Sequence, residues 1–143
     1  MSKGNTFEND LMKLIFQATA IANIADNAGT GPLTNLYVSL HTADPGEAGD
    51  QTTNEATYTG YARVAVARTS GGWTVTNNAV ENAGAVNFGA CSAGSNTITH
   101  FAVGTLVSGA GKILYSGALT SSLAVSAGIT PSFAAGALDI TED

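Results

Sequence analysis

The clearest pattern in this chain is the alternation of apolar and polar residues in short runs after residue 35. Leu36, Val38 and Leu40 fall on one side of an extended chain, and the residues between them fall on the other. The segment 61–68 repeats the alternation. A period of two is typical of half-buried β-strands, because a helical period of 3.6 residues would scatter the same side chains around the axis. The pattern therefore predicts two strands joined by the polar connection 42–60.

This connection is long for a hairpin and carries the acidic residues Asp44, Glu47, Asp50 and Glu55. Carboxylates do not enter a core without partners, so we expect the segment to run over the surface. Pro45 and Gly46 predict a turn. The spacing of the acids does not fit a calcium loop, which needs alternating acids and a final glutamate. Long surface connections often contact partners, and this one is therefore a candidate contact surface.

Residues 7–26 form the one segment with a helical pattern. Its apolar residues recur three and four positions apart, at Phe7, Leu11, Leu14, Ile15, Ala18 and Ala22. Glu8 follows Asn5 at the spacing of a capping box, and Gly29 is the predicted stop. Met12, Phe16 and Ile21 widen the apolar surface. The helix therefore either packs wholly within its own fold or also contacts a neighbouring chain, and the sequence leaves both open.

Beyond residue 69, turns rich in glycine and asparagine separate further short runs. These runs lie at 73–76, around 80, and at 86–88, 97–103, 112–116, 119–125 and 137–141. About eight strands with no helix between them predict a mostly β fold, an antiparallel β-sandwich or barrel. We find no repeat, linker or second domain, so we expect residues 1–143 to form a single β-sandwich domain with an N-terminal helix at about 7–26.

The chain carries unusually little charge. Charged residues make up 11% of it, against about 25% in most proteins, and the net charge is −6. A surface of small uncharged residues indicates one that other proteins cover. Five dispersed basic residues argue against binding nucleic acid. No apolar run reaches the roughly 18 residues of a membrane span, and Glu8 and Asp10 argue against an export signal. We therefore expect neither a nucleic-acid nor a membrane partner.

Residues suited to catalysis or metal binding are few and do not form motifs. Cys91 is the sole cysteine, so we expect a small buried apolar residue. His41 and His100 fall opposite the predicted core face, and a histidine with one nearby carboxylate lacks the ligand set of a zinc site. We interpret both as hydrogen-bonded surface histidines. Gly109–Lys112 lacks the other residues of a phosphate loop, and no nucleophile motif occurs. The sequence therefore predicts no enzyme and no cofactor.

Five longer blocks of the sequence carry a family resemblance. They are Leu36–Gly49, Ala56–Val66, Ile98–Gly104, Gly111–Gly117 and Ile129–Gly136. Together they resemble a family of short tailed-bacteriophage virion proteins, whose members are labelled tail-fibre or minor structural proteins. The size and fold also resemble those of capsid cement (decoration) proteins, which are β-sandwiches of jelly-roll type on the outside of the phage head.

The resemblance implies a virion structural protein without catalytic residues. The preferred hypothesis is a cement protein on the outer capsid surface that bridges subunits of the major capsid protein and pairs with itself, as a dimer more readily than a trimer. The alternatives are a tail-fibre or head-fibre module that contacts the host receptor, and a small carbohydrate-binding domain. The candidate contact residues for a capsid or other partner are His41, Asp44, Pro45, Glu47, Tyr58, Phe7 and Phe16.

Overall fold

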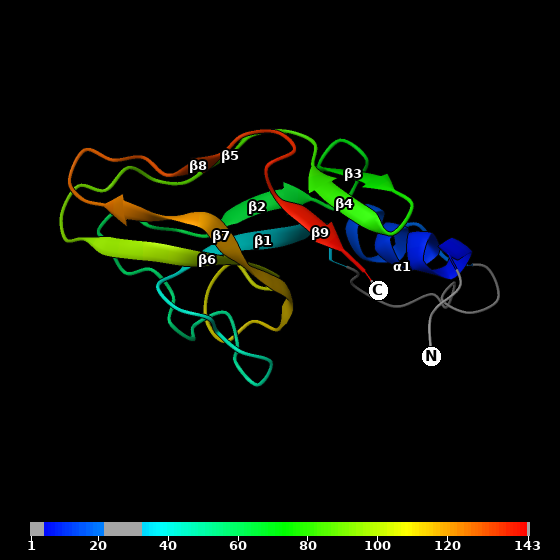
Figure 1. Cartoon of the computed structure of the whole chain (residues 1–143), viewed down its shortest axis with the longest axis horizontal. Helices are drawn as coiled ribbons and strands as arrows, with labels where there is room; N and C mark the ends of the chain where they lie inside the picture. Colours follow the sequence, from blue (N-terminus) through cyan, green and yellow to red (C-terminus); the bar gives the residue numbers. More distant parts are fainter. Residues whose placement is uncertain (1–4, 22–32, 143) are drawn as a thin grey trace. The chain divides into compact units, whose positions relative to one another are not determined.

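The computed structural model describes residues 5–21 and 33–142, without the side chains of Asn5 and Phe7. In these residues it shows one helix and nine strands (Figure 1). They are α1 (Asn5–Gln17), β1 (Asn35–His41), β2 (Val64–Ala67), β3 (Trp73–Thr76), β4 (Ala79–Asn82), β5 (Val86–Asn87), β6 (Asn96–Gly104), β7 (Ile113–Val125), β8 (Ser132–Phe133) and β9 (Asp139–Thr141). The predicted mostly β, antiparallel fold with one N-terminal helix is confirmed. The jelly-roll connection is compatible with it and stays a prediction.

The chain divides into two compact units. The first comprises residues 1–35, 66–85 and 133–143, and the second comprises residues 36–65 and 86–132. Each unit has buried apolar side chains of its own, such as Trp73 and Val80 in the first and Leu40 and Ile98 in the second. The single β-sandwich domain expected for residues 1–143 stays a prediction.

The largest sheet, most of which belongs to the second unit, has the strand order β2-β1-β6-β7. β1 pairs with β6 in antiparallel register from Tyr37 opposite Gly104 to His41 opposite His100. Leu36, Val38 and Leu40 are buried, at 2%, 0% and 1% exposure, which confirms the predicted inward face of this strand. Two short strands, β5 and β8, form a separate pair.

The other face of β1 is also buried, which the alternation did not predict. Ser39 and His41 are both 0% exposed. The interpretation of His41 as a surface histidine is therefore wrong, although it is hydrogen-bonded as expected. His100 is half-buried and lies beside Thr99, with 2.9 Å between its Nδ1 and the threonine Oγ1. A polar side chain can face the interior when it finds hydrogen-bond partners there, and alternation alone cannot distinguish that case from a solvated face.

In the first unit, α1 packs on the sheet of strand order β3-β4-β9. Met12 and Phe16, one helical turn apart, are both fully buried, and the ring of Phe16 meets Trp73 edge to face with 4.7 Å between centroids. Leu11, Leu14 and Ile15 are only half-buried, and Ala18 is exposed. The predicted stripe is therefore wrong for its described residues, because Met12 and Phe16, which the pattern predicts only to widen it, are the ones that face the sheet.

The helix ends at Gln17, well before the predicted end near residue 26. Ala18 has a left-handed φ of 53°, and the N–H of Thr19 donates to the Lys13 carbonyl at 3.1 Å. Arg68 stabilises this end: its Nε donates to the Ile15 carbonyl at 2.7 Å and its Nη2 to the Leu14 carbonyl at 2.7 Å. A guanidinium there satisfies carbonyls that lack a helical partner and suits the negative end of the helix dipole. Residues 22–26 of the predicted helix lie outside the described residues.

We expect Arg68→Ala to lower the free energy of unfolding by about 2–3 kcal/mol, because hydrogen bonds from a charged donor each contribute about 1.5–3 kcal/mol and solvent replaces part of them. Arg68 also donates to the Leu33 carbonyl at 2.7 Å, so a third bond is lost. Arg68→Lys is the matched control, since it keeps the charge but not the planar set of donors. Urea unfolding followed by circular dichroism measures both variants. Equal stability of wild type and Arg68→Ala would contradict this role.

Candidate protein-contact surface

The connection 42–60 is held to β1 by the buried ring of His41. Its Nδ1 lies 2.8 Å from the Thr53 carbonyl oxygen, and its Nε2 lies 2.9 Å from the Ser39 Oγ. A carbonyl oxygen can only accept, so Nδ1 carries a proton. Burial favours the neutral ring, in which Nε2 is then the acceptor for the Ser39 hydroxyl. The neutral ring thus uses both nitrogens, and one of its bonds reaches the middle of the connection.

The pKa of His41 lies below the usual 6.5, chiefly because burial disfavours the charged ring, and Arg63 and His100 lower it further. The Thr53 carbonyl and Glu55 oppose this shift. A depressed histidine pKa means that the unfolded chain takes up a proton near pH 6.5 that the folded chain does not. The contribution of His41 to stability is therefore complete above pH 6.5, and it decreases as the pH falls below that value.

We expect the stability of the protein to fall between pH 6.5 and 5 at up to about 1.4 kcal/mol per pH unit from this residue. His41→Asn should remove this part of the pH dependence, as measured by urea unfolding at a series of pH values. Titration of the His41 ring protons by NMR in the wild type gives a direct reading that needs no variant. A ring that titrates at or above pH 6.5 would overturn the prediction.

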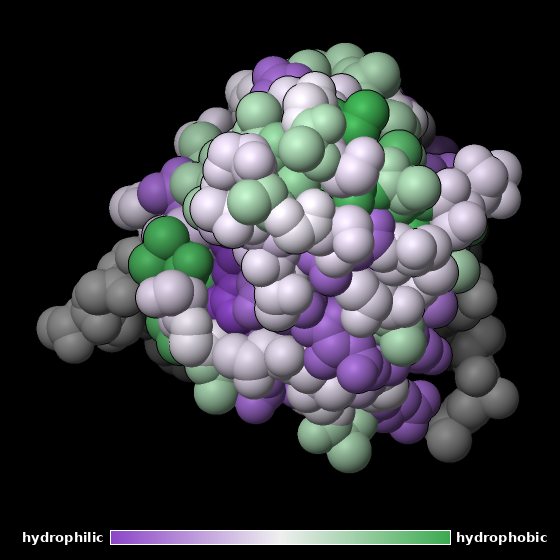
Figure 2. Space-filling view, turned by 90° about the vertical axis from the view of Figure 1, so that its left-hand side faces the viewer, coloured by the Kyte–Doolittle hydropathy of each residue, from purple (hydrophilic) through white to green (hydrophobic). Residues whose placement is uncertain are grey.

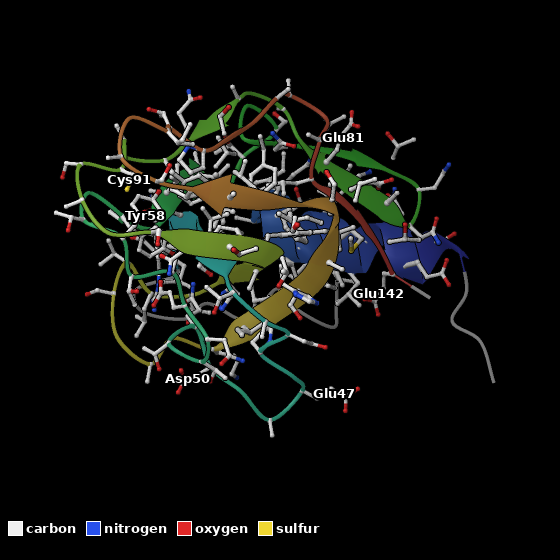
Figure 3. The ribbon with its side chains drawn as sticks, turned by 60° about the vertical axis from the view of Figure 1, so that its left-hand side comes forward. Glu47, Asp50, Tyr58, Glu81, Cys91 and Glu142 are labelled. Atoms are coloured by element: carbon white, nitrogen blue, oxygen red, sulfur yellow. The ribbon has the colours of Figure 1, made fainter. Side chains whose placement is uncertain are left out.

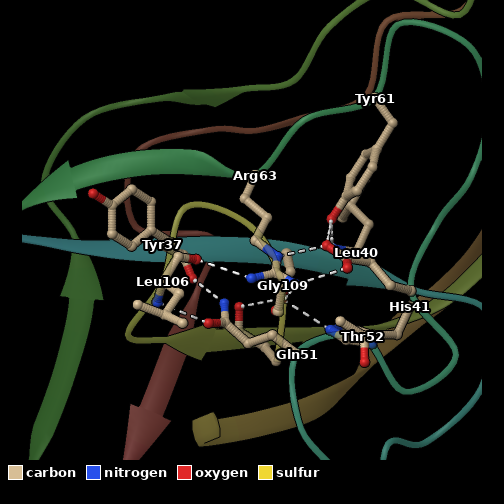
Figure 4. Close-up of polar contacts among 12 residues, drawn as sticks. Tyr37, Leu40, His41, Gln51, Thr52, Tyr61, Arg63, Leu106 and Gly109 are labelled. Carbon is tan, nitrogen blue, oxygen red and sulfur yellow. Dashed lines mark hydrogen bonds and ion pairs between the residues drawn. The ribbon is translucent and has the colours of Figure 1, made fainter. Parts of the chain in front are cut away.

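Gln51 is a second anchor, and it is fully buried. Its Nε2 donates to the Tyr37 carbonyl at 3.3 Å, and its Oε1 accepts from the backbone N–H of Leu106 at 3.0 Å (Figure 4). A Cβ on Gly104 or Gly111 would come within 2.1 Å of the Gln51 side chain. Glycine at these two positions is therefore required for the amide to fit, and the amide ties the connection to the loop after β6.

The third anchor is the buried ion pair of Arg63 with Glu55. The guanidinium binds both carboxylate oxygens, at 2.6 Å from Nε to Oε1 and 2.8 Å from Nη2 to Oε2. It also donates to the carbonyls of Leu106 at 3.0 Å and Gly109 at 2.8 Å (Figure 4). The hydrogen bond with Glu55 raises the pKa of Arg63 above its ordinary value. Because the acid is paired, it is largely withdrawn from solvent, with its side chain 16% exposed.

Tyr61 completes this group of anchors. Its hydroxyl donates to Glu55 Oε1 at 2.9 Å and accepts from the Leu40 N–H at 3.1 Å. Burial raises the pKa of the phenol above its usual value, so the hydroxyl stays protonated and keeps both bonds. The polar groups that face the interior here are therefore mutually satisfied, which favours one fixed arrangement of the connection.

The outer side of the connection carries the exposed acids. Asp44 and Glu47 are exposed, and Figure 3 shows Glu47 at the outer end of its loop. The Asp44 Oδ1 accepts the N–H of Gly46 at 2.9 Å, and Gly46 has a left-handed φ of 70°. This is the turn that Pro45 and Gly46 predict. The Asp44 carbonyl is in turn bound by the Asn54 side-chain amide at 3.0 Å.

Two hollows flank the anchored connection. The first, of about 360 Å³, lies between the loop from Asp44 to Gly49 and the start of β7. The second, of about 270 Å³, lies between Glu55–Arg63 and the loop tip at Val107. Leu106 and Val107 are 45% and 61% exposed, a high fraction for large apolar side chains. The exposed acids Asp44 and Glu47 thus line the first hollow, and the exposed apolar Val107 lines the second.

The structure brings only part of the predicted contact set together at the surface. Asp44 and Glu47 are exposed side by side in one loop, while Pro45 between them is buried. His41 on β1 and Tyr58 within the connection are both buried, and the Tyr58 hydroxyl donates to the Gly89 carbonyl at 3.0 Å. Phe16 lies in the core of the other unit. The side chain of Phe7 lies outside the described residues.

Sequence reasoning missed the exposed pair Leu106 and Val107. The signal was present: two large apolar residues stand directly before the Ser108–Gly111 turn, where a chain normally places small or polar residues. It also missed the anchoring roles of Gln51 and Arg63. A single glutamine belongs to no recognisable sequence motif. Arg63 and Glu55 lie eight positions apart, a spacing that does not indicate an ion pair in the sequence.

No other cluster in the described part of the chain is arranged for chemistry. Within residues 5–21 and 33–142 no three His, Cys, Asp or Glu side chains lie close enough to hold a metal ion. Cys91 is buried, as predicted, with its Sγ 3.4 Å from the Ala93 carbonyl. Of the described helices none is long and apolar enough to span a membrane. The face drawn in Figure 2 is mostly of intermediate hydropathy, with strongly polar and strongly apolar residues in small patches.

Comparison with known proteins gives one family. No curated protein matches the chain. The family described as podophage GP4 fiber I protein gp80 matches residues 2–141, nearly the whole length. This confirms the predicted resemblance to a phage virion family. The family is one of structural fibre proteins and not of enzymes. The chain belongs to the family of podophage GP4 fiber I protein gp80, and it is a structural protein of the phage virion.

Proposed function

We propose that this protein is a subunit of a virion fibre and that it joins a neighbouring virion protein through the anchored connection 42–60. Membership of a fibre family over residues 2–141 carries the fibre assignment. The contact surface is supported by the three buried anchors, which fix residues 51–55 of the connection. The Asn54 amide then binds the Asp44 carbonyl, so the loop that carries the exposed Asp44 and Glu47 is held to this fixed part without a partner. A surface fixed in advance loses less conformational entropy on binding.

A second candidate is the cement role, in which the protein bridges subunits of the major capsid protein on the outer head surface. The low charge of the chain, 11% of residues, favours it, because such a surface suits dense packing among protein neighbours. The 13-residue α1 also offers no heptad stripe from which a fibre shaft could be built. Many weak contacts repeated over a capsid lattice would add through multivalency.

Purified virions distinguish the two roles. Gold-labelled antibodies raised against the protein locate it by electron microscopy, and quantitative mass spectrometry gives its copy number relative to the major capsid protein. The fibre role predicts label on fibres and a copy number far below that of the capsid subunit. Label spread over the head at comparable copy number would overturn the fibre role and support the cement role. Absence from the virion would overturn both.

We also propose that copies of the chain associate with one another, most simply as a dimer about a two-fold axis. Sedimentation velocity of the purified chain over a range of concentrations tests this. A species of twice the chain mass is expected. A single species of 14.3 kDa at every concentration would overturn it.

A further inference from the structure

In the described chain, β7 is the longest strand that lies at the edge of a sheet. β7 is the last strand of its sheet, so one side pairs with β6 and the other side faces no further strand. Its 13 residues, ILYSGALTSSLAV, include no charged residue and no proline. Charges and proline are the usual means by which proteins protect an edge from pairing with another chain. This edge lacks both.

A bulge limits the part of the edge that can pair. Residues 119–122 lie opposite the single residue Thr99, since Ala118 pairs with His100 and Leu123 pairs with Ile98. Such a bulge bends a strand and interrupts its pairing. A second register shift, between Val103 and Gly104, leaves Leu114 outside the register. The part of the edge before the larger bulge is therefore residues 113–118, in which the regular register runs from Tyr115 to Ala118.

The first hollow of the contact surface runs along this same stretch. It is lined by Ile113, Leu114, Tyr115 and Ser116, four residues in a row. Tyr115 and Ser116 are consecutive in the regular register, so their side chains point to opposite faces of the sheet. A hollow that touches both therefore follows the edge and not one face. β6 occupies the other edge, with Ala102 opposite Ser116. The loop from Asp44 to Gly49 forms the opposite wall.

The charge of the Asp44–Gly49 loop indicates which kind of segment could bind in the hollow. Both charged residues that line the hollow are acidic, Asp44 and Glu47, and both are exposed. The apolar Ile113 and Leu114 on the strand side suit the aliphatic stem of a long basic side chain. A second copy of this chain fits poorly here, because its net charge is −6 and its basic residues are few. A basic segment of another protein is complementary to the hollow.

We propose that an extended, lysine- or arginine-rich segment of another virion protein adds as a strand along residues 113–118 of β7 and places a basic side chain between Asp44 and Glu47. Strand addition to a free sheet edge uses main-chain hydrogen bonds for affinity and side-chain pockets for specificity. This inference rests on the proposed function in taking the connection as the contact surface, and it names the chemistry of the partner.

Two capped hexapeptides test it on the full-length protein: one of alternating lysine and valine, and one with glutamate in place of lysine. The lysine peptide is expected to bind and the glutamate peptide is not, as measured by NMR chemical-shift titration. Glu47→Lys should weaken the lysine peptide about fivefold or more, since it replaces an exposed attraction by a repulsion. Glu81→Lys on β4 is the matched control: it makes the same charge change at another exposed site and should leave binding unchanged.

Hydrogen exchange gives a second reading, because an added strand slows exchange of amides within 113–118 and a purely electrostatic contact does not. Equal binding of both peptides, no binding at millimolar concentration, an equal loss in Glu81→Lys, or unchanged exchange at 113–118 would each overturn the inference. None of these results depends on where the protein lies in the virion. The proposed fibre role and the proposed basic partner can therefore be disproved independently of each other.

Discussion

Replacing Glu55 with alanine is expected to lower the free energy of unfolding by about 3 kcal/mol, at the low end of the range for breaking a buried ion pair. The change leaves the Arg63 guanidinium buried, with its side chain only 2% exposed, and without its counter-charge. The carbonyls of Leu106 and Gly109 remain as acceptors and moderate the loss. The Tyr61 hydroxyl loses its acceptor as well. Urea unfolding followed by circular dichroism measures the effect.

Two further variants isolate the cause. Glu47→Ala removes an exposed carboxylate of the same connection and should change stability by less than about 0.5 kcal/mol. The double variant Glu55→Ala with Arg63→Met removes both charges and should recover part of the loss, because an apolar pair avoids the uncompensated charge. If the double variant is less stable than Glu55→Ala alone, the unpaired charge is not the cause of the destabilisation.

Leu40→Asp is expected to destabilise the protein by at least about 4 kcal/mol, which is enough to unfold many small domains. Leu40 is 1% exposed on the inward face of β1, so a carboxylate there would be removed from solvent. Leu106→Asp is the matched control, since the same substitution is made at a side chain that is 45% exposed. Thermal unfolding by circular dichroism compares the two. An unchanged melting temperature in Leu40→Asp would mean that the inward face of β1 is wrongly assigned.

The strands were predictable because their signal is local. Leu36, Val38 and Leu40 alternate with other residues, and the burial of these three side chains follows the alternation. Ser39 and His41 alternate equally well, but their burial depends on the Thr53 carbonyl twelve positions after His41. A polar side chain may find its hydrogen-bond partners in a distant segment or in water. The alternation of apolar and polar residues in the sequence is the same in both cases.

The end of the helix shows the same limit. Nothing between Gln17 and Gly29 marks a strong stop in the sequence, and the predicted helix continued through that stretch. The guanidinium that binds the final carbonyls belongs to Arg68, more than fifty positions away. Helix propensity is a weak preference that tertiary contacts override.

The sequence predicted which segment lies outside, but not which of its side chains are exposed, and its role as a contact surface stays a prediction. Acidity and a Pro-Gly turn predicted that the connection lies outside, and Asp44 and Glu47 do. His41, which holds the connection to β1, and Tyr58, which is part of the connection, are both buried instead. The edge of β7 could not be foreseen, because which strand ends a sheet depends on the strand order and not on the composition of one strand.

Both arginines of the chain are engaged by the protein itself, Arg63 with Glu55 and Arg68 with the end of the helix. Only Arg63 has a counter-charge in Glu55, because Arg68 binds neutral carbonyls. Four basic and ten acidic side chains then remain, so the electric field around the molecule is mainly negative. In dilute buffer two copies repel each other well before they touch, whereas at 0.1 M salt screening shortens the range of that repulsion to about 10 Å. A higher ionic strength during assembly should thus allow copies of the chain to pack more closely.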